Sequence, residues 1–314
     1  MDLLVAVVWG ALGVGLLVWG AERLVTGVRA RATLIGASAL VIGLLATSAD
    51  VESTAAGLAA AHKGLESVAV GISLGSVVFL VTVALGVAAL LFPFSVRTPS
   101  YFLLAMAGSA GAAGLVLLDG RLGRVEAAFL VALFAGLLVG TRRHLPGMGE
   151  PVEGTNAEPA GSTLVRTRTR FVLTVGTSLL MMAIGAELLA EGAHRAVAAS
   201  HQSETFIGMV VVAVALSLEE GLLEVLPTYR GVPEIAVGNV IGTTVFLLTA
   251  SLGVVGVVHP LRVRPEVVTF HVPAMLGAVA LCTWALTRNR TGRREGAVLV
   301  AYYVAYLIAS AVLA

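Results

Sequence analysis

Four acidic side chains lie in two short segments that are otherwise made of apolar or small residues. One segment (ATSADVESTAAG) contains Asp50 and Glu52, and the other (AVALSLEE) contains Glu219 and Glu220. Neither segment has a Lys or Arg that could neutralise these acids. Carboxylates grouped without a basic partner favour two kinds of chemistry, which are the binding of a cation and the transfer of protons.

The composition indicates that these acids belong to a membrane protein. The chain is 58% hydrophobic and 12% charged, with a mean hydropathy of +0.96, whereas soluble domains have roughly 25% charged residues. The apolar runs are continuous and lack a period of two, so they predict spanning helices rather than barrel strands. The sequence therefore predicts an all-α integral membrane protein with ten transmembrane helices, at 2–22, 34–61, 66–91, 101–118, 124–140, 171–193, 205–226, 234–258, 267–286 and 296–313.

The basic residues predict the orientation of the chain. If the spans alternate, one side holds Arg29, Arg31, Arg97, Arg142, Arg143, Arg166, Arg168, Arg170, Arg230, Arg288, Arg290, Arg293 and Arg294, and the other holds Lys63, Arg121, Arg124, Arg195, Arg262 and Arg264. The positive-inside bias places the side with more basic residues in the cytoplasm. Both termini are therefore expected on the extracytoplasmic side of the cytoplasmic membrane. A net charge of +1 gives no indication of a nucleic-acid partner.

A repeated sequence divides the chain into two halves. Residues 64–86 match residues 231–253 at 11 of 23 positions with a constant offset of 167. Each half has five predicted spans, an odd number, so the halves enter the membrane from opposite sides, as in the inverted repeats of secondary transporters. We expect a first half at 1–140, a flexible cytoplasmic linker at 141–170 and a second half at 171–314.

The repeat places the acids at corresponding positions of the two halves. Inverted-repeat transporters bind their substrate near the bilayer midplane, between corresponding helices. A carboxylate at the centre of a spanning helix costs roughly 2.5–3.5 kcal/mol on insertion scales, so we expect these acids to serve an ion. The alternative is that they are protonated residues hydrogen-bonded between helices. The offset of 167 aligns Asp50 with Ser217, Glu52 with Glu219, and Ser53 with Glu220.

Three other acids are expected at the membrane surface and not in the site. Glu224 lies one turn beyond Glu220 and shortly before Pro227, close to the predicted end of its helix. Glu22 and Glu187 likewise lie near the ends of their predicted spans. At such positions a carboxylate can reach water without crossing the apolar core.

The motifs around the acids resemble the two alpha-repeats of the sodium/calcium exchanger family, within the cation/calcium exchanger superfamily. That family has a G-T-S-x-P-E-like segment, a K/R-G turn and an A-x-G-N-x-x-G-S-N-x-F segment. The second half reads ALSLEE, YRG and AVGNVIGTTVF, and the first half reads SADVES, HKG and AVGISLGSVVF. The resemblance covers most of the chain. It implies a cation antiporter rather than an enzyme, with no cofactor and with Ca²⁺, Na⁺ or H⁺ as transported ions.

The resemblance also implies which side chains bind the ion. Carried over position by position, the implied ligands are Asp50, Ser53, Ser76, Ser217, Glu220, Asn239 and Thr243. Asp50 stands where the family has Ser and Ser53 where it has Glu, so the number of carboxylates per site is kept. Glu52 and Glu219 stand at the position of the motif proline, and we expect them to bind the ion or to transfer protons.

The chain departs from the family pattern at several of these positions. Leu80 and Leu247 stand where family members have a carboxamide or carboxylate, which removes two ligands. Ile72 replaces the G-N asparagine in the first half. Loss of the motif prolines removes the residues that would break these helices and free carbonyl oxygens for an ion. Because Ca²⁺ takes six to eight oxygens, the site offers fewer than usual unless Glu52 and Glu219 turn inward.

These observations predict a secondary antiporter that exchanges a cation, most simply Ca²⁺ for Na⁺ or H⁺, by alternating access. A proton-coupled exchanger of another cation and a degenerate paralogue that no longer transports remain alternatives. An intramembrane hydrolase with Asp50 and Glu220 as an acid pair is disfavoured, because symmetric carboxylates suit alternating access and no Ser/His motif accompanies them. The expected partners are inorganic cations and the lipid bilayer, and the sequence does not fix the oligomeric state.

Overall fold

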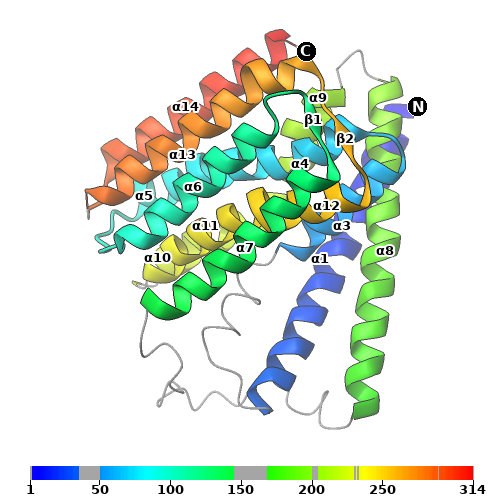
Figure 1. Cartoon of the computed structure of the whole chain (residues 1–314), viewed down its shortest axis with the longest axis horizontal. Helices are drawn as coiled ribbons and strands as arrows, with labels where there is room; N and C mark the ends of the chain where they lie inside the picture. Colours follow the sequence, from blue (N-terminus) through cyan, green and yellow to red (C-terminus); the bar gives the residue numbers. More distant parts are fainter. Residues whose placement is uncertain are drawn as a thin grey trace.

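The protein is built almost entirely of helices (Figure 1). The computed structural model describes residues 2–34, 50–144, 168–199, 204–229, 231, 233–288 and 290–313. The α-helices are α1 (Asp2–Leu34), α3 (Val51–His62), α4 (Glu66–Phe79), α5 (Leu85–Leu91), α6 (Ser100–Val116), α7 (Arg124–His144), α8 (Arg168–Ala199), α9 (Glu204–Phe206), α10 (Ala213–Tyr229), α11 (Pro233–Val245), α12 (Leu252–Val258), α13 (Val272–Thr287) and α14 (Arg293–Leu313). Wider π-helical turns join several of them, namely η1 (Leu80–Ala84), η2 (Ile207–Val212), η3 (Phe246–Ser251) and η4 (Val267–His271).

Helix length and hydropathy support a membrane protein. Within the described ranges, six helical stretches are long and apolar enough to cross a bilayer, at 66–91, 124–141, 172–196, 236–258, 267–287 and 293–313. Three shorter apolar helices cover 5–20, 100–116 and 207–217. The second predicted span, 34–61, lies partly outside the described residues, and its described part is α3. The first predicted span, 2–22, lies within α1, whose apolar part covers 5–20 and whose helix continues to Leu34.

The turns between helices recur at the offset seen in the sequence. Gly64, after α3, has φ +75°, and Gly231, after α10, has φ +78°. Both are in the left-handed region, where a side chain is disfavoured, which explains the glycine of each K/R-G turn. Pro93 and Pro260 each follow the end of a helix, since α5 ends at Leu91 and α12 ends at Val258.

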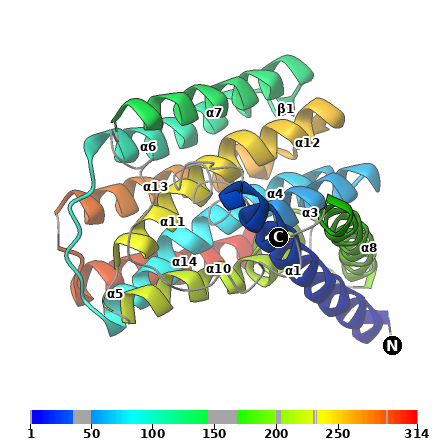
Figure 2. The same ribbon diagram turned by 90° about the horizontal axis from the view of Figure 1, so that it is seen from below.

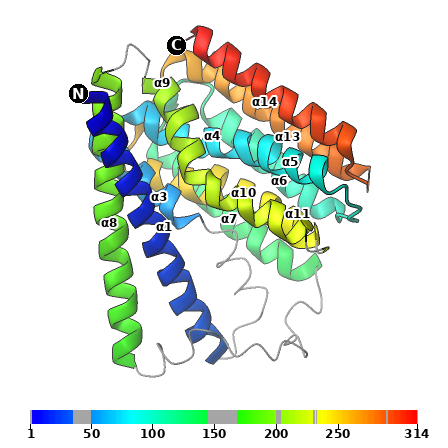
Figure 3. The same ribbon diagram turned by 180° about the vertical axis from the view of Figure 1, so that it is seen from behind.

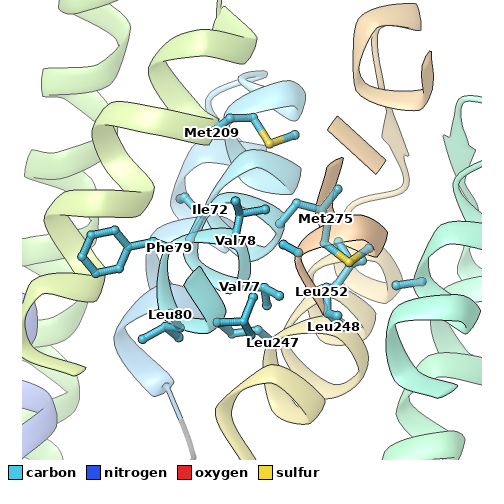
Figure 4. Close-up of a cluster of buried hydrophobic side chains, with 14 of the residues drawn as sticks. Ile72, Val77, Val78, Phe79, Leu80, Met209, Leu247, Leu248, Leu252 and Met275 are labelled. Carbon is cyan, nitrogen blue, oxygen red and sulfur yellow. The ribbon is translucent and has the colours of Figure 1, made fainter. Parts of the chain in front are cut away.

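Two long, buried helices cross at the centre of the molecule. One runs through α4, η1 and α5, and the other through α11, η3 and α12; α4 contacts η3, and α11 contacts η1. Each contains a threonine whose hydroxyl donates to the carbonyl four residues earlier, Thr82 to Val78 and Thr249 to Val245. Such bonds compete with the backbone hydrogen bonds of the helix, and here they occur within the π-helical turns η1 and η3. Figure 4 shows apolar side chains of both helices packed together.

The outer helices pack on this pair in a reciprocal way. α14 contacts α5, and α7 contacts α12, as Figure 2 shows for the second pair. At one end of the molecule, β1 (Arg121–Leu122) pairs with β2 (Leu261–Arg262) in antiparallel fashion. At the other end, Phe94 forms an isolated bridge with Thr291. In both places the segment that follows a central helix pairs with the turn between two helices of the other half. The two termini lie toward the same end of the molecule (Figure 1).

Helices α1 and α8 form a pair at the edge of the bundle (Figure 3). Glycines allow their backbones to approach closely: a Cβ on Gly13 would lie 2.5 Å from the Leu189 nitrogen, and one on Gly185 would lie 2.7 Å from the Leu17 nitrogen. Such small-residue contacts are typical of helices that associate within a membrane. α8 also contacts α3, which ties the pair to the rest of the bundle.

Candidate functional site

Asp50 forms the start of α3. Its Oδ1 accepts a hydrogen bond of 2.8 Å from the backbone N–H of Ser53, and its backbone angles, φ −74° and ψ 75°, are not helical. A short carboxylate at the N-cap satisfies an otherwise unpaired helix N–H. A new helix therefore begins within the first motif although the motif proline is absent, because Asp50 supplies the cap. The side chain is buried, with 3% exposed.

Glu52 lies in the first turn of α3, and it too is buried, with 8% exposed. A carboxylate in the first turn is favoured by the positive end of the helix dipole. Asp50 and Glu52 therefore bring two buried acids to one helix N-terminus.

Four of the predicted ligands are buried and have oxygens without a hydrogen-bond partner among the described residues. They are Ser53, Ser217, Asn239 and Thr243, and the Asn239 amide nitrogen is unpartnered as well. Seven other side chains in the described part of the chain, Thr98 and Ser178 among them, also have buried oxygens without a partner. Leaving a buried polar group unpaired costs about 1–3 kcal/mol, so native structures do so rarely. Unpartnered oxygens at these positions are available to a ligand. All four were predicted as ion ligands.

Ser76 marks the place where α4 meets the second motif. Its Oγ donates to the Ala213 carbonyl over 3.4 Å, and Ala213 lies one helical turn before Ser217. Gly75 makes this approach possible, because a Cβ there would clash with the Met209 carbonyl. The structure therefore brings the hydroxyl positions of α4 and α10 to the same helix crossing.

Glu219 and Glu220 lie on α10, but their side chains lie outside what the structure describes. The helix runs from Ala213 to Tyr229 without interruption. The two halves thus differ, because α3 starts at its motif whereas α10 continues through the corresponding position. Among the side chains that are described, no group of three His, Cys, Asp or Glu residues could hold a metal ion.

Leu80 and Leu247 fill the positions at which the family resemblance implies two further ligands. Leu80 begins η1, and Leu247 is the second residue of η3. Both are completely buried in the apolar core (Figure 4). Neither supplies an oxygen, so an ion held here depends on the remaining acids, hydroxyls and the Asn239 amide.

The prediction that Glu224 lies at the membrane surface is wrong. Its side chain is completely buried, and neither carboxylate oxygen has a hydrogen-bond partner among the described residues. The sequence does contain a signal for this burial. Glu224 follows Ser217 by seven residues, two helical turns, and so lies on the same face of α10.

Glu187, also expected at the surface, pairs with Lys63 at the end of α3. The Lys63 Nζ lies 2.6 Å from Glu187 and 3.3 Å from Glu191, both on α8. The hydrogen bond to Glu187, followed by that to Glu191, raises the pKa of Lys63. This network connects α8 to α3 outside the candidate site.

Comparison with known proteins identifies the family. The family model described as "Sodium/calcium exchanger protein" matches residues 5–141 and 170–312, which include both motifs and most of the chain. The chain belongs to the sodium/calcium exchanger family. Members of this family are membrane transporters rather than enzymes, and the protein is accordingly a multi-pass membrane protein.

Relatives extend over nearly the full length of this exchanger-family chain. It is 28% identical over 320 residues to the CaxA protein of Alkalimonas amylolytica, covering 97% of this chain and 98% of the relative. The sodium-calcium exchanger NCX_Mj has a similar fold, with TM-score 0.65, 21% identity and 98% coverage of each chain. The H⁺/Ca²⁺ exchanger CAX superposes with TM-score 0.76 and 14% identity, covering 97% of this chain and 86% of CAX. These two structures share the fold.

Proposed function

We propose that this protein is a secondary active antiporter that exchanges Ca²⁺ for Na⁺ or H⁺ by alternating access. The observation that carries the proposal is the set of buried, unpartnered oxygens at the predicted ligand positions of both halves, together with buried Asp50 and Glu52. Hard cations such as Ca²⁺ are held by carboxylate, hydroxyl and amide oxygens. Membership of the exchanger family supports the same function.

The ion-binding set in this proposal comprises Asp50, Glu52, Ser53, Ser76, Ser217, Glu219, Glu220, Asn239 and Thr243. Asp50 and Glu220 provide one carboxylate in each half. Glu52 and Glu219 bind the ion or carry protons. The motif residues of α3 and α4 and those of α10 and α11 then face one central site, in keeping with the contacts between α10 and both α4 and α11.

The proposed architecture is ten transmembrane helices arranged as two inverted five-helix repeats. Reciprocal packing supports it, since α14 contacts α5 as α12 contacts α7. The left-handed turns at Gly64 and Gly231 recur at the same offset of 167. We further propose that both termini face away from the cytoplasm in the cytoplasmic membrane, with the segment 141–170 inside.

Ion uptake into proteoliposomes containing the purified protein tests the function. Radioactive Ca²⁺ is supplied outside, with an outward Na⁺ gradient in one set and an outward H⁺ gradient in another. We expect uptake with at least one gradient and no uptake by empty liposomes. Absence of uptake with both gradients, from protein that is monodisperse and folded, would overturn the proposal.

Substitutions that keep shape and remove charge connect the activity to the site. Asp50→Asn and Glu220→Gln are expected to abolish uptake, because each removes the carboxylate of one half. Glu234→Gln is the matched control, since Glu234 is exposed at the start of α11. Wild-type uptake by both site variants would show that the ion binds elsewhere.

Buried Leu80 and Leu247 favour a second candidate, which is proton-coupled exchange of a cation other than Ca²⁺. They remove two oxygens that a Ca²⁺ site of this kind would use, and fewer ligands suit a cation with a lower coordination number. Competition in the same uptake assay distinguishes the candidates. Unlabelled Ca²⁺ in excess suppresses uptake of another divalent cation only if Ca²⁺ binds the same site.

A further inference from the structure

Glu224 is a buried carboxylate that has no role in the candidate cation site. It is 0% exposed, and both of its carboxylate oxygens lack a hydrogen-bond partner in the described part of the chain. An ionised carboxylate without a partner in an apolar interior is strongly disfavoured, whereas the neutral acid is tolerated. The surroundings therefore suit a group that holds a proton in this conformation.

The face of α10 that carries Glu224 also carries Ser217. Ser217, Gly221 and Glu224 fall within about 60° of one another around the helix. A Cβ on Gly221 would lie 3.5 Å from the Phe79 ring and 3.7 Å from Ala84, so this face is turned toward α4 and η1. Glu224 thus lies between the candidate ligand Ser217 and the end of α10.

The first half has no acid at the corresponding position. The offset of 167 aligns Glu224 with Gly57, where an added Cβ would lie 3.2 Å from Val255 on α12. The residue of α5 that corresponds to Val255 is Ala88, which is completely buried. α10 contacts α5 as α3 contacts α12. In the first half the small residue Gly57 on α3 faces the larger Val255 on α12. In the second half the corresponding residues are Glu224 on α10 and the smaller Ala88 on α5, and this exchange of sizes leaves room for the carboxyl group.

The charged and titratable groups around Glu224 decide whether its carboxyl group has a partner. Cys282, completely buried on α13, is close enough to interact with it electrostatically. The charged or titratable residues on helices that contact α10, and on α10 itself, are Asp2, Glu22, Arg23, Arg29, Arg31, Glu52, His62, Glu66, Glu219, Glu220, Tyr229 and Glu234. Among the side chains that are described, none forms a hydrogen bond or ion pair with Glu224. These surroundings therefore favour the neutral acid over the carboxylate.

The end of α10 gives a short route to water. Thr228, on the same face, donates its hydroxyl to the Glu224 carbonyl over 2.7 Å, and the next residue, Tyr229, is exposed. Tyr229 lies five positions after Glu224, about 7.5 Å further along the helix axis. A modest opening of this end would let the carboxyl group exchange its proton with bulk water.

We propose that Glu224 is a proton-binding site separate from the cation site, and that it takes up and releases the proton that this transporter exchanges for its cation. The inference rests on the antiporter proposed above. Uptake converts the carboxylate to the neutral acid at one Oε atom, and release restores the carboxylate. No covalent bond other than this O–H bond forms or breaks.

Infrared difference spectroscopy tests the proton directly and does not depend on transport. Spectra of the reconstituted protein in acidic and alkaline buffer are expected to differ in the C=O stretch of a carboxylic acid. Glu224→Gln, which keeps size and removes the titratable group, is expected to lack the part of this band that the Glu224 carboxyl contributes, and the exposed control Glu234→Gln to retain it. A buried-acid band that is unchanged in Glu224→Gln would overturn the inference.

Transport measurements connect the proton to exchange. In Glu224→Gln we expect loss of Ca²⁺ uptake driven by an H⁺ gradient, while Ca²⁺ binding measured by thermal shift persists. Uptake by this variant equal to wild type under an H⁺ gradient, or wild-type uptake driven by Na⁺ alone, would overturn the inference and leave the antiporter proposal intact. No uptake by the wild type under any gradient would instead refute the antiporter proposal, and the infrared band would still decide whether Glu224 binds a proton.

Discussion

His62 and His259 pack edge to face where α3 and α12 end, with ring centroids 5.7 Å apart. Phe92 and Tyr229 pack in a similar tilted arrangement, with centroids 5.1 Å apart, where α5 and α10 end. The offset of 167 relates His62 to Tyr229 and Phe92 to His259. The two aromatic contacts are therefore equivalents in the two halves, and each joins a motif helix of one half to a central helix of the other.

The inverted arrangement predicts that these two aromatic contacts lie on opposite sides of the membrane. In a background in which Cys282 is replaced by Ala, His62→Cys is expected to react with a membrane-impermeant thiol reagent added outside intact cells. Tyr229→Cys, which is also exposed, is expected to react only after the cells are opened. Labelling of both from the same side would contradict the inverted arrangement, and the Cys-free background controls for other thiols.

Asp50 is expected to show separable structural and ionic roles. Asp50→Ala removes the N-cap of α3 and should lower the free energy of unfolding by about 0.5–2 kcal/mol. Asp50→Asn keeps an oxygen for the Ser53 N–H and should unfold near the wild-type temperature, yet lose Ca²⁺ uptake. Thermal unfolding in detergent, with uptake measured on the same samples, checks both. Equal loss of stability in the two variants would argue against the cap.

The unpartnered hydroxyls predict an uncommon combination of effects. Ser217→Ala and Thr243→Val remove buried oxygens that make no bond to the described protein. Their stability without Ca²⁺ should be equal to or higher than that of the wild type, because a desolvated polar group is lost. Stabilisation by added Ca²⁺ should become smaller, because the stabilisation that a ligand gives increases with the logarithm of its affinity for the folded state. Thr269→Val, at an exposed threonine outside the site, is the control.

The Lys63 bridge predicts a dependence on alkaline pH. Its pKa is raised above the ordinary value of 10.5 by the bond to Glu187. The bridge therefore contributes fully below that ordinary value, and its contribution is lost as the pH rises through the raised pKa. Because Glu187 is largely exposed, the contribution should be about 0–1 kcal/mol. A double-mutant cycle with Lys63→Gln and Glu187→Gln at neutral and strongly alkaline pH measures it. A coupling energy that is the same at both pH values would exclude the bridge as its source.

Continuous apolar runs predicted most helices well, because hydrophobic length alone decides whether a segment can span a bilayer. Pro93 and Pro260 lie just beyond the ends of α5 and α12, as expected of a residue that cannot continue a helix. The helix α1 continues beyond its predicted span and includes Arg29 and Arg31, in keeping with the good helix propensity of arginine. The π-helical turns η1 and η3 were not predicted, because the apolar run continues through each of them without a proline or a glycine.

The sequence predicted which residues form the candidate site, but it could not predict whether their side chains have hydrogen-bond partners. The motif positions identified Ser53, Ser217 and Thr243, and only the structure reveals that these hydroxyls lack partners among the described residues. Burial of Glu224 was not predicted, because the prediction rested on how close Glu224 lies to the helix end. The face of α10 that Glu224 shares with Ser217 would have indicated burial. The N-cap role of Asp50 was not predicted, because loss of the motif proline indicated that the helix would continue through this position.

The wide turns η1 and η3 contain information about the history of the chain. They cover Leu80–Ala84 and Phe246–Ser251, and the offset of 167 aligns them without any insertion or deletion between residues 64–86 and 231–253. A π-helical turn is a rare, local widening of an α-helix. Its presence at the same place in both central helices is what a repeated unit that already contained the wide turn would leave in each half.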